Sequence, residues 1–297
     1  NFTIEIAVSH DSPEIVFYVS VPKDRKTLLE KQILSFYRDA KITEVTNDYN
    51  VFNSGGSIMA ASAEFGGEDV FPLKTHDEFD HDPMNTILNA FSKLDKTKEG
   101  AALQFVIMPA GDRYIKKFSG YLNKVKKGEK LKNVLDEFGD VKKELKSFGS
   151  MLWNGPKKEG DKIEEKDVDD KAVENISAKI NSTIVLANIR VVASSTDSVR
   201  TNEILSNIES AFSQFEKPSS NSIRFKKIEE KKLGQFLHSF SFRLPSDFGA
   251  LPLNLKELAT LVHFPVGLAS SPELKESKAG SASAPLNMNA QGVKIGI

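Results

Sequence analysis

The densest group of side chains able to bind a metal ion lies between His76 and Asp82. Two histidines and four carboxylates occur there within seven residues. Imidazole and carboxylate groups are ligands for divalent metal ions, so a metal site is one hypothesis. The alternative is a solvated acidic loop that ends in a helix, with Asp82 as the cap in front of Pro83. We favour the loop, and we predict no metal ion and no cofactor. The other three histidines are solitary and are expected to be structural: His10, His238 and His263.

A second chemically suggestive group is basic. Between Gly111 and Lys132 the sequence has eight Lys or Arg against two acidic residues. Lysines spread over successive helical turns can neutralise phosphates without reading base sequence. The candidate nucleic-acid contacts are Arg113, Lys116, Lys117, Lys124 and Lys127. A solvated helix face explains the same charges, and it is the interpretation that we favour.

Motifs of known catalytic types are missing from the sequence. The phosphate loop G-x-x-x-x-G-K-[ST] is absent, and Gly55-Gly56 and Gly66-Gly67 lie between expected strands, as hairpin turns do. No G-x-S-x-G motif occurs, and no cysteine is present to act as a nucleophile or to form a disulfide. The expected strand 57–63 has no aromatic ring on which an RNA base could stack. We predict no catalytic residues and a chain that is not itself an enzyme.

Length and composition indicate an ordinary globular protein of about two domains. The chain has 297 residues, of which 39% are apolar and 27% charged, and a formal net charge of −1. This balance provides no general attraction to nucleic acid, so binding would need a local patch. No apolar run approaches the roughly 20 residues of a membrane-spanning helix. Residues 1–8 alternate as a strand does and lack the basic start of a signal peptide, which suggests a piece of a longer protein.

Apolar periodicity predicts the elements of the first half. Strands are expected at 2–8, 14–21, 42–45, 57–65 and 101–108, and helices at 24–37 and 83–91. The continuous apolar run 101–108 is typical of a strand covered on both faces. From Glu14 to Met108 the order is strand, helix, strand, strand, helix, strand. This is the ferredoxin-like order, with an extra strand in front.

The second half repeats this order of elements. After the basic helix and a charged segment, the pattern predicts helix 172–180, strand 184–192, helix 204–215, strands 223–228 and 236–244, and helix 255–262. The fold class is therefore α+β, an α/β sandwich of two ferredoxin-like modules of βαββαβ type. The expected division is a first module at 1–128, a helical and charged linker at 129–170, a second module at 171–264 and a Ser/Ala/Pro-rich tail at 265–297.

Several stretches of the chain match one family in order and spacing. They are Glu14–Pro22, Leu29–Ile33, Asp48–Phe52, Asp82-Pro83, Ala102–Ala110, Leu255–Pro265, Ala284–Asn287 and Gly292. Together they resemble the N-terminal, pre-ATPase region of conjugative-transfer ATPases, the type IV secretion coupling proteins of the HerA–FtsK-like group. Each stretch alone is weakly specific, and the match depends on their combination.

The resemblance implies an accessory domain without catalytic activity in a DNA-translocating motor. Its expected tasks are subunit assembly, docking on the secretion channel or guidance of the substrate. Its expected partners are further copies of the chain, held through a motor domain beyond residue 297, secretion-channel proteins and DNA. Its expected place is the cytoplasmic, inner face of the cell membrane, with any anchor upstream of Asn1. The alternative is a free-standing nucleic-acid-binding or structural interaction module that uses the basic helix 111–132.

Overall fold

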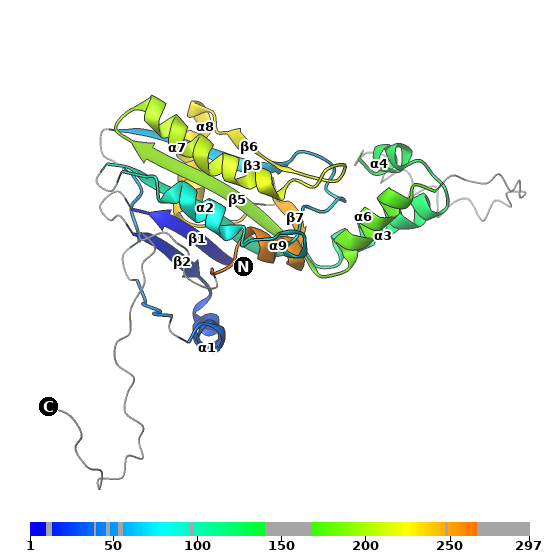
Figure 1. Cartoon of the computed structure of the whole chain (residues 1–297), viewed down its shortest axis with the longest axis horizontal. Coiled ribbons are helices and arrows are strands. Elements are labelled where there is room, and N and C mark those ends of the chain that lie inside the picture. The colour runs from blue at the N-terminus through cyan, green and yellow to red at the C-terminus, as the bar shows by residue number, and fades with distance from the viewer. Residues whose placement is uncertain are drawn as a thin grey trace, which may run out of the picture.

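One antiparallel sheet organises the computed structural model (Figure 1). The residues that the structure describes are 1–9, 14–38, 40–45, 48–52, 56–95, 98–139, 168–246 and 249–265. Within them the sheet has seven strands: β1 Phe2–Val8, β2 Ile15–Ser20, β3 Ser57–Phe65, β4 Gly100–Pro109, β5 Ile184–Ser195, β6 Ile223–Lys227 and β7 Leu251–Asn254. Their spatial order is β2-β1-β4-β5-β3-β6, and β7 pairs with β5.

Strand β5 is the centre of the sheet. One of its edges pairs with β4, from Val185 opposite Pro109 to Ser194 opposite Gly100. Its other edge is shared, because β7 pairs with residues 184–187 and β3 pairs with residues 190–195. Isoleucine and valine dominate this strand, and such residues suit a pleated surface that is packed on both faces.

The expected α+β class is confirmed, but the two expected modules are not separate. Strand β5 from the second half lies between β3 and β4 from the first half. The order β3, α2 (Met84–Phe91), β4, β5, α7 (Ser198–Ser210), β6 is one strand-helix-strand, strand-helix-strand unit that spans both halves. Local patterns predicted these strands well, yet they carry no information on which strands pair.

Two expected strands are wrong. Residues 42–45 form no strand. Residues 236–241 belong to helix α8 (Glu230–Ser241). The alternation of Phe240, Phe242 and Leu244 suggested a strand. However, the apolar side chains of α8 that face the sheet have helical spacing, and they are Leu233, Phe236, Leu237 and Phe240.

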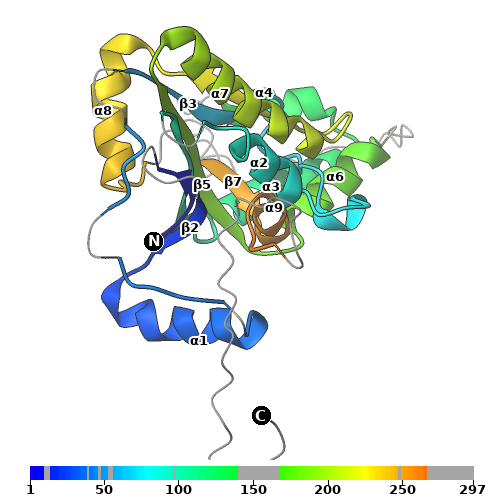
Figure 2. The same cartoon turned by 60° about the vertical axis from the view of Figure 1, so that its left-hand side comes forward.

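Helices cover the two faces of the sheet unequally. On one face α2, α7, the 3-10 turn Ala211–Phe215 and α9 (Leu255–Leu261) bury the main core, which includes Ile6, Phe105, Ile189 and Phe212. On the opposite face α8 packs over Ala60, Ala102 and Val192. Figure 2 shows α8 on one side of β5 and α2 on the other.

A helical lobe extends from one end of the sheet (Figure 1). It consists of α3 (Arg113–Lys126), α4 (Leu131–Gly139) and α6 (Asp170–Ile180). A second core holds α3 and α6 together, and its members include Phe118, Tyr121, Val125, Ile176 and Leu186. A buried ion pair between Lys179 of α6 and Glu257 of α9, with Nζ–Oε2 at 2.8 Å, fastens this lobe to the sheet.

Helix α1 (Lys26–Phe36), which follows the 3-10 turn Lys23–Arg25, lies apart from both cores. It has no buried residue, and of its expected apolar stripe Phe36 is 80% exposed. Both views place α1 beyond β2, away from the rest of the sheet (Figures 1 and 2). Its end is held by Tyr37, whose hydroxyl donates to the Phe264 carbonyl at 2.9 Å. None of the described helices combines the length and the apolar character needed to cross a bilayer.

Candidate functional site

A row of polar side chains crosses the middle of the sheet on the α8 face. Glu5 of β1 lies opposite Gln104 of β4, and Gln104 lies opposite Arg190 of β5. All three are buried, with at most 4% of each residue exposed. The pairing register places the three side chains side by side on one face of the sheet, where Thr3 of β1 and Asn188 of β5 are also buried polar residues.

Hydrogen bonds satisfy this row from both sides. The Gln104 amide donates to Glu5 Oε1 at 2.5 Å and to the Phe240 carbonyl at 2.9 Å. The Arg190 guanidinium donates to Gln104 Oε1 at 3.1 Å and to the Leu244 carbonyl at 2.8 Å. The carbonyls belong to the end of α8 and the turn after it, so the polar row holds that turn against the sheet.

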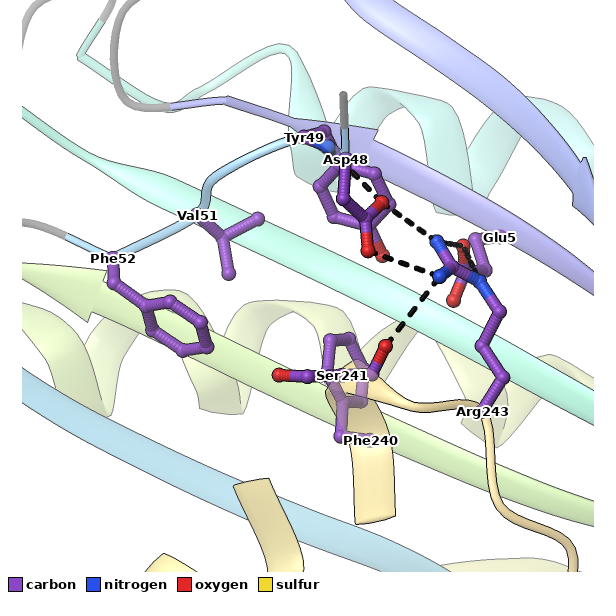
Figure 3. A pocket seen from close by; sticks show the side chains of 8 residues that line it. All are labelled: Glu5, Asp48, Tyr49, Val51, Phe52, Phe240, Ser241 and Arg243. Carbon is purple, nitrogen blue, oxygen red and sulfur yellow. Dashed lines mark hydrogen bonds and ion pairs between the residues drawn. The ribbon is translucent and has the colours of Figure 1, made fainter. Parts of the chain in front are cut away.

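Arg243 closes the row at its solvent side (Figure 3). Its guanidinium donates to Glu5 Oε2 at 2.7 Å, and to both oxygens of Asp48 at 2.9 and 2.8 Å. A bidentate contact of this kind is the strongest geometry for an arginine and a carboxylate. Arg243 has a positive φ of 53°, and this left-handed turn directs its side chain back over the sheet. The cation joins β1, the segment 48–52 and the turn after α8.

The segment 48–52 approaches the sheet closely. The Val51 carbonyl accepts a hydrogen bond from the Ser194 hydroxyl. It also occupies the place where a Cβ atom on Gly100 would lie, so glycine at this position permits the contact. Tyr49 stacks on Tyr18 with ring centres 4.4 Å apart. Its buried hydroxyl has no hydrogen-bond partner among the residues that the structure describes.

Burial shapes the ionisation of this group. Burial raises the pKa of Glu5, and the charge of Arg243 and the Gln104 hydrogen bond oppose it only in part. Burial also raises the pKa of Tyr49, with the nearby Glu5 carboxylate adding to the effect. For Arg243, burial acts to lower the pKa, but the hydrogen bond to Asp48 and the charge of Glu5 outweigh it and raise the pKa. Burial lowers the pKa of Arg190.

A perturbed carboxyl group in a hollow is a common mark of a functional site. Here the hollow is lined by Glu5, Asp48, Tyr49, Arg243 and their neighbours, and its volume is about 20 Å³. That is room for about one water molecule. The arrangement can clamp three segments of backbone together.

The basic helix is present as expected, and it is α3. Lys117 is half-buried and pairs with Asp69 at 3.2 Å, and Lys124 pairs with Glu137 at 2.6 Å. Burial acts to lower the pKa of Lys117, but the Asp69 charge and Tyr121 outweigh it and raise the pKa. The Lys116 ammonium lies 3.9 Å from Asp112 on the exposed side of the helix.

The two remaining candidates lie at the ends of α3. The Arg113 guanidinium is 5.0 Å from the centre of the Tyr114 ring, and Lys127 follows the last helical residue. Four of the five cations therefore lie in α3, and Lys127 comes directly after it. Nucleic-acid contact by them stays a prediction.

The residues between His76 and Asp82 are used structurally. Residues 76–78 form a 3-10 turn, and Thr75 and Glu78 cap it reciprocally. No group of three or more potential ligands for a metal ion occurs among the described residues. Asp82 accepts a hydrogen bond from the Met84 amide at 2.8 Å, but α2 begins at Met84 with Pro83 as its N-cap, one residue later than expected. His263, which was expected to be solitary, lies 2.8 Å from the same Asp82 oxygen, while His10 is outside the described residues.

The polar row was missed by the search for motifs. Glu5, Gln104 and Arg190 are far apart in sequence and form no pattern of their own. One signal could have found Gln104, because it interrupts the apolar run 101–108, which was expected to be covered on both faces; Glu5 was expected on the polar side of an alternating strand. A polar residue at such a position needs a partner, and partners at the same depth of neighbouring strands are available.

The chain belongs to the family described as Domain of unknown function (DUF8128), whose model matches residues 2–275. No curated protein and no solved structure matches the chain. The family match spans both halves of the sheet and the helical lobe. It assigns no activity.

Proposed function

We propose that the chain is a non-catalytic accessory domain of a type IV secretion or conjugative DNA-translocating ATPase. In this proposal it serves subunit assembly, docking on the secretion channel or guidance of the substrate at the inner face of the cell membrane. The support from sequence is the resemblance that runs from Glu14 to Gly292. Its partners would be further copies of the chain, channel proteins and DNA.

One structural observation carries the proposal. The buried ionisable side chains hold backbone segments together. Glu5 and Arg243 join β1 to the segment 48–52, and Lys179 and Glu257 join the helical lobe to α9. Groups committed in this way favour a binding or structural role over chemistry on a substrate.

The position of α1 supports a docking role. The described chain ends at residue 265, beside the place where Tyr37 holds α1. Exposed apolar side chains gather in the same stretch of sequence, and they are Leu28, Leu34, Phe36, Ile42 and Val45. Exposed apolar surface of this kind is suited to contact a neighbouring domain or subunit.

The coding sequence offers the simplest test. A G-x-x-x-x-G-K-[ST] motif encoded after residue 297 is expected, and a stop codon at that point would contradict the proposal. In the full-length protein, Phe36→Glu on α1 should leave ATP hydrolysis unchanged and lower DNA transfer. Val199→Glu is the matched control, because Val199 is also an exposed apolar residue, on α7. Equal transfer by the two variants would argue against docking through α1.

The alternative is a free-standing nucleic-acid-binding module that uses α3. It has weaker support, because Lys117 and Lys124 already have carboxylate partners within the chain. Those ion pairs would have to be broken or shared before both lysines could neutralise phosphates.

A further inference from the structure

The edges of the sheet differ in how they are protected from pairing with other chains. Strand β6 has five residues, three of which are cations: Arg224, Lys226 and Lys227. Strand β7 has four residues and contains Pro252, which cannot donate a backbone hydrogen bond. Short length, charge and proline are the usual means by which an edge strand avoids aggregation.

Strand β2 has neither the charges nor the proline. Its six residues, Ile15–Ser20, include no charge and no proline. One edge pairs with β1, and no strand in the described ranges lies along the other edge. Phe17 and Val19 are only half-buried, whereas β4 inside the sheet is buried from Gly100 to Met108.

We propose that the outer edge of β2 pairs with β2 of a second copy of this chain, antiparallel about a two-fold axis perpendicular to the sheet. Such an axis keeps corresponding faces together, so the two sheets become one continuous sheet. In two-fold pairing each strand lies opposite an identical strand of the other copy. Like charges that face each other across this contact would destabilise the dimer. Strand β2 brings no charge to this contact. Strand β6 would bring three cations opposite three cations.

A second observation points to the same partner. In residues 21–45, which follow β2, no described residue is buried. Helix α1 within this segment has 11 residues, and an isolated helix of that length is only marginally stable in water. The segment lies beyond the β2 edge (Figures 1 and 2), and α1 follows the last residues of that strand. Antiparallel pairing carries α1 of each copy toward the first residues of the partner's β2.

The experiment introduces single cysteines into the full chain. The protein has no cysteine, so a single substitution introduces a unique thiol. Cysteines are placed one at a time at Val16, Phe17 and Val19, and at Lys226 on β6 as the control edge. A disulfide needs Cβ atoms about 3.5–4.5 Å apart. We expect cross-linked dimers to form fastest at one position in β2, the one nearest the two-fold axis, and not at Lys226.

A charge-exchange pair tests the contact without cross-linking. Sedimentation of the unmodified chain should show a dimer that dissociates on dilution. Val19→Lys and Val19→Glu should each sediment as a folded monomer, with circular dichroism confirming the fold. An equimolar mixture should restore the dimer, because the two copies then bring opposite charges to the contact in place of like charges.

Two results would overturn the pairing. One is a chain that stays monomeric at every concentration, and the other is a dimer that survives both Val19 variants and cross-links at no β2 position. The pairing needs no motor domain. A monomeric chain would therefore refute it and leave the proposed function untouched, whereas a stop codon after residue 297 would refute the motor and leave the pairing untouched.

Discussion

Two groups of charged side chains connect distant segments of the chain, and they differ in their access to water. Lys179 and Glu257, between α6 and α9, have side chains that are 0% exposed. The Glu257 carboxylate accepts two bonds from Lys179 and one each from the Leu73 and Asn254 amides. In the other group Glu5 is buried, but Arg243 is 22% exposed and Asp48 is half-exposed. Burial without water demands a complete set of partners, while a group at the surface can replace a lost partner by water.

The comparison teaches which connection is the more rigid. The dry pair joins the helical lobe to the sheet, and its charges have no other means of solvation. The Arg243 group joins a loop and a turn to the sheet, and its rim can admit water. We therefore expect the lobe to be fixed to the sheet more firmly than the segment 48–52. The predictions below test this difference, from the largest effect to the smallest.

The largest effect is expected from Lys179→Ala. Removing the cation leaves the Glu257 carboxylate buried without a counter-charge, and loss of one partner of such a pair destabilises by about 3–5 kcal/mol. Urea unfolding gives the free energy of unfolding. Lys171→Ala on the exposed side of the same helix is the control. Similar losses for the two variants would show that the dry pair contributes nothing special.

A smaller loss is expected from Arg243→Gln. Glu5 keeps its bond from Gln104 and loses two bonds to a charged donor, an effect of about 1.5–3 kcal/mol for a charged hydrogen bond. Arg224→Gln on β6 is the control, because Arg224 is exposed. Hydrogen exchange of residues 48–52 should rise in Arg243→Gln. If the loss of stability exceeded that of Lys179→Ala, the comparison between the wet and the dry group would be wrong.

A pH dependence of modest size is expected from Glu5. Its pKa in the folded protein is raised above the ordinary value of 4.5, so the folded state holds this proton more tightly than the unfolded state does. The stabilisation by Glu5 is therefore complete below pH 4.5 and is lost as the pH rises through the raised pKa. Compared with Glu5→Gln, the unmodified protein should lose stability as the pH rises from 4.5 through the raised pKa of Glu5. Parallel pH profiles for the two proteins would contradict the assignment.

The smallest effect is expected on the wet surface of α3, where charges have water on one side throughout. Lys116→Glu and Lys127→Glu should change neither the free energy of unfolding by more than about 0.5 kcal/mol nor the affinity for DNA. The measurement is DNA binding over a salt titration. A binding constant that falls with the substitution, together with a flatter salt dependence, would instead support nucleic-acid contact by this helix.

Much of the local structure could be predicted from the sequence. The apolar run at 101–108 is a strand buried on both faces, Asp82 accepts a hydrogen bond from the first residue of α2, and the basic helix packs through Phe118, Tyr121 and Val125. These predictions succeeded because each depends on residues within a few turns or pleats of one another. The polar row of Glu5, Gln104 and Arg190 could be seen in the sequence only as polar residues in three separate strands.

Long-range pairing accounts for what could not be predicted. Glu5 and Gln104 are 99 positions apart, and Gln104 and Arg190 are 86 apart. Nothing in the chemistry of one strand specifies its neighbour at such distances, since any apolar strand of suitable length can pair. The same limit explains why two modules were expected where one sheet exists. The error at α8 has a local cause instead, because an alternating sequence follows its helical stripe.

By itself the sequence determined the class of fold, the positions of most elements and the absence of cysteine chemistry, because these depend on composition and local period. The tertiary structure decided that β5 joins the two halves, that Arg243 links Glu5 to Asp48, and that α1 lies outside the core. It also showed that β2 is the uncharged edge of the sheet. Each of these depends on which distant segments meet, and that choice is made by the packing of the whole chain.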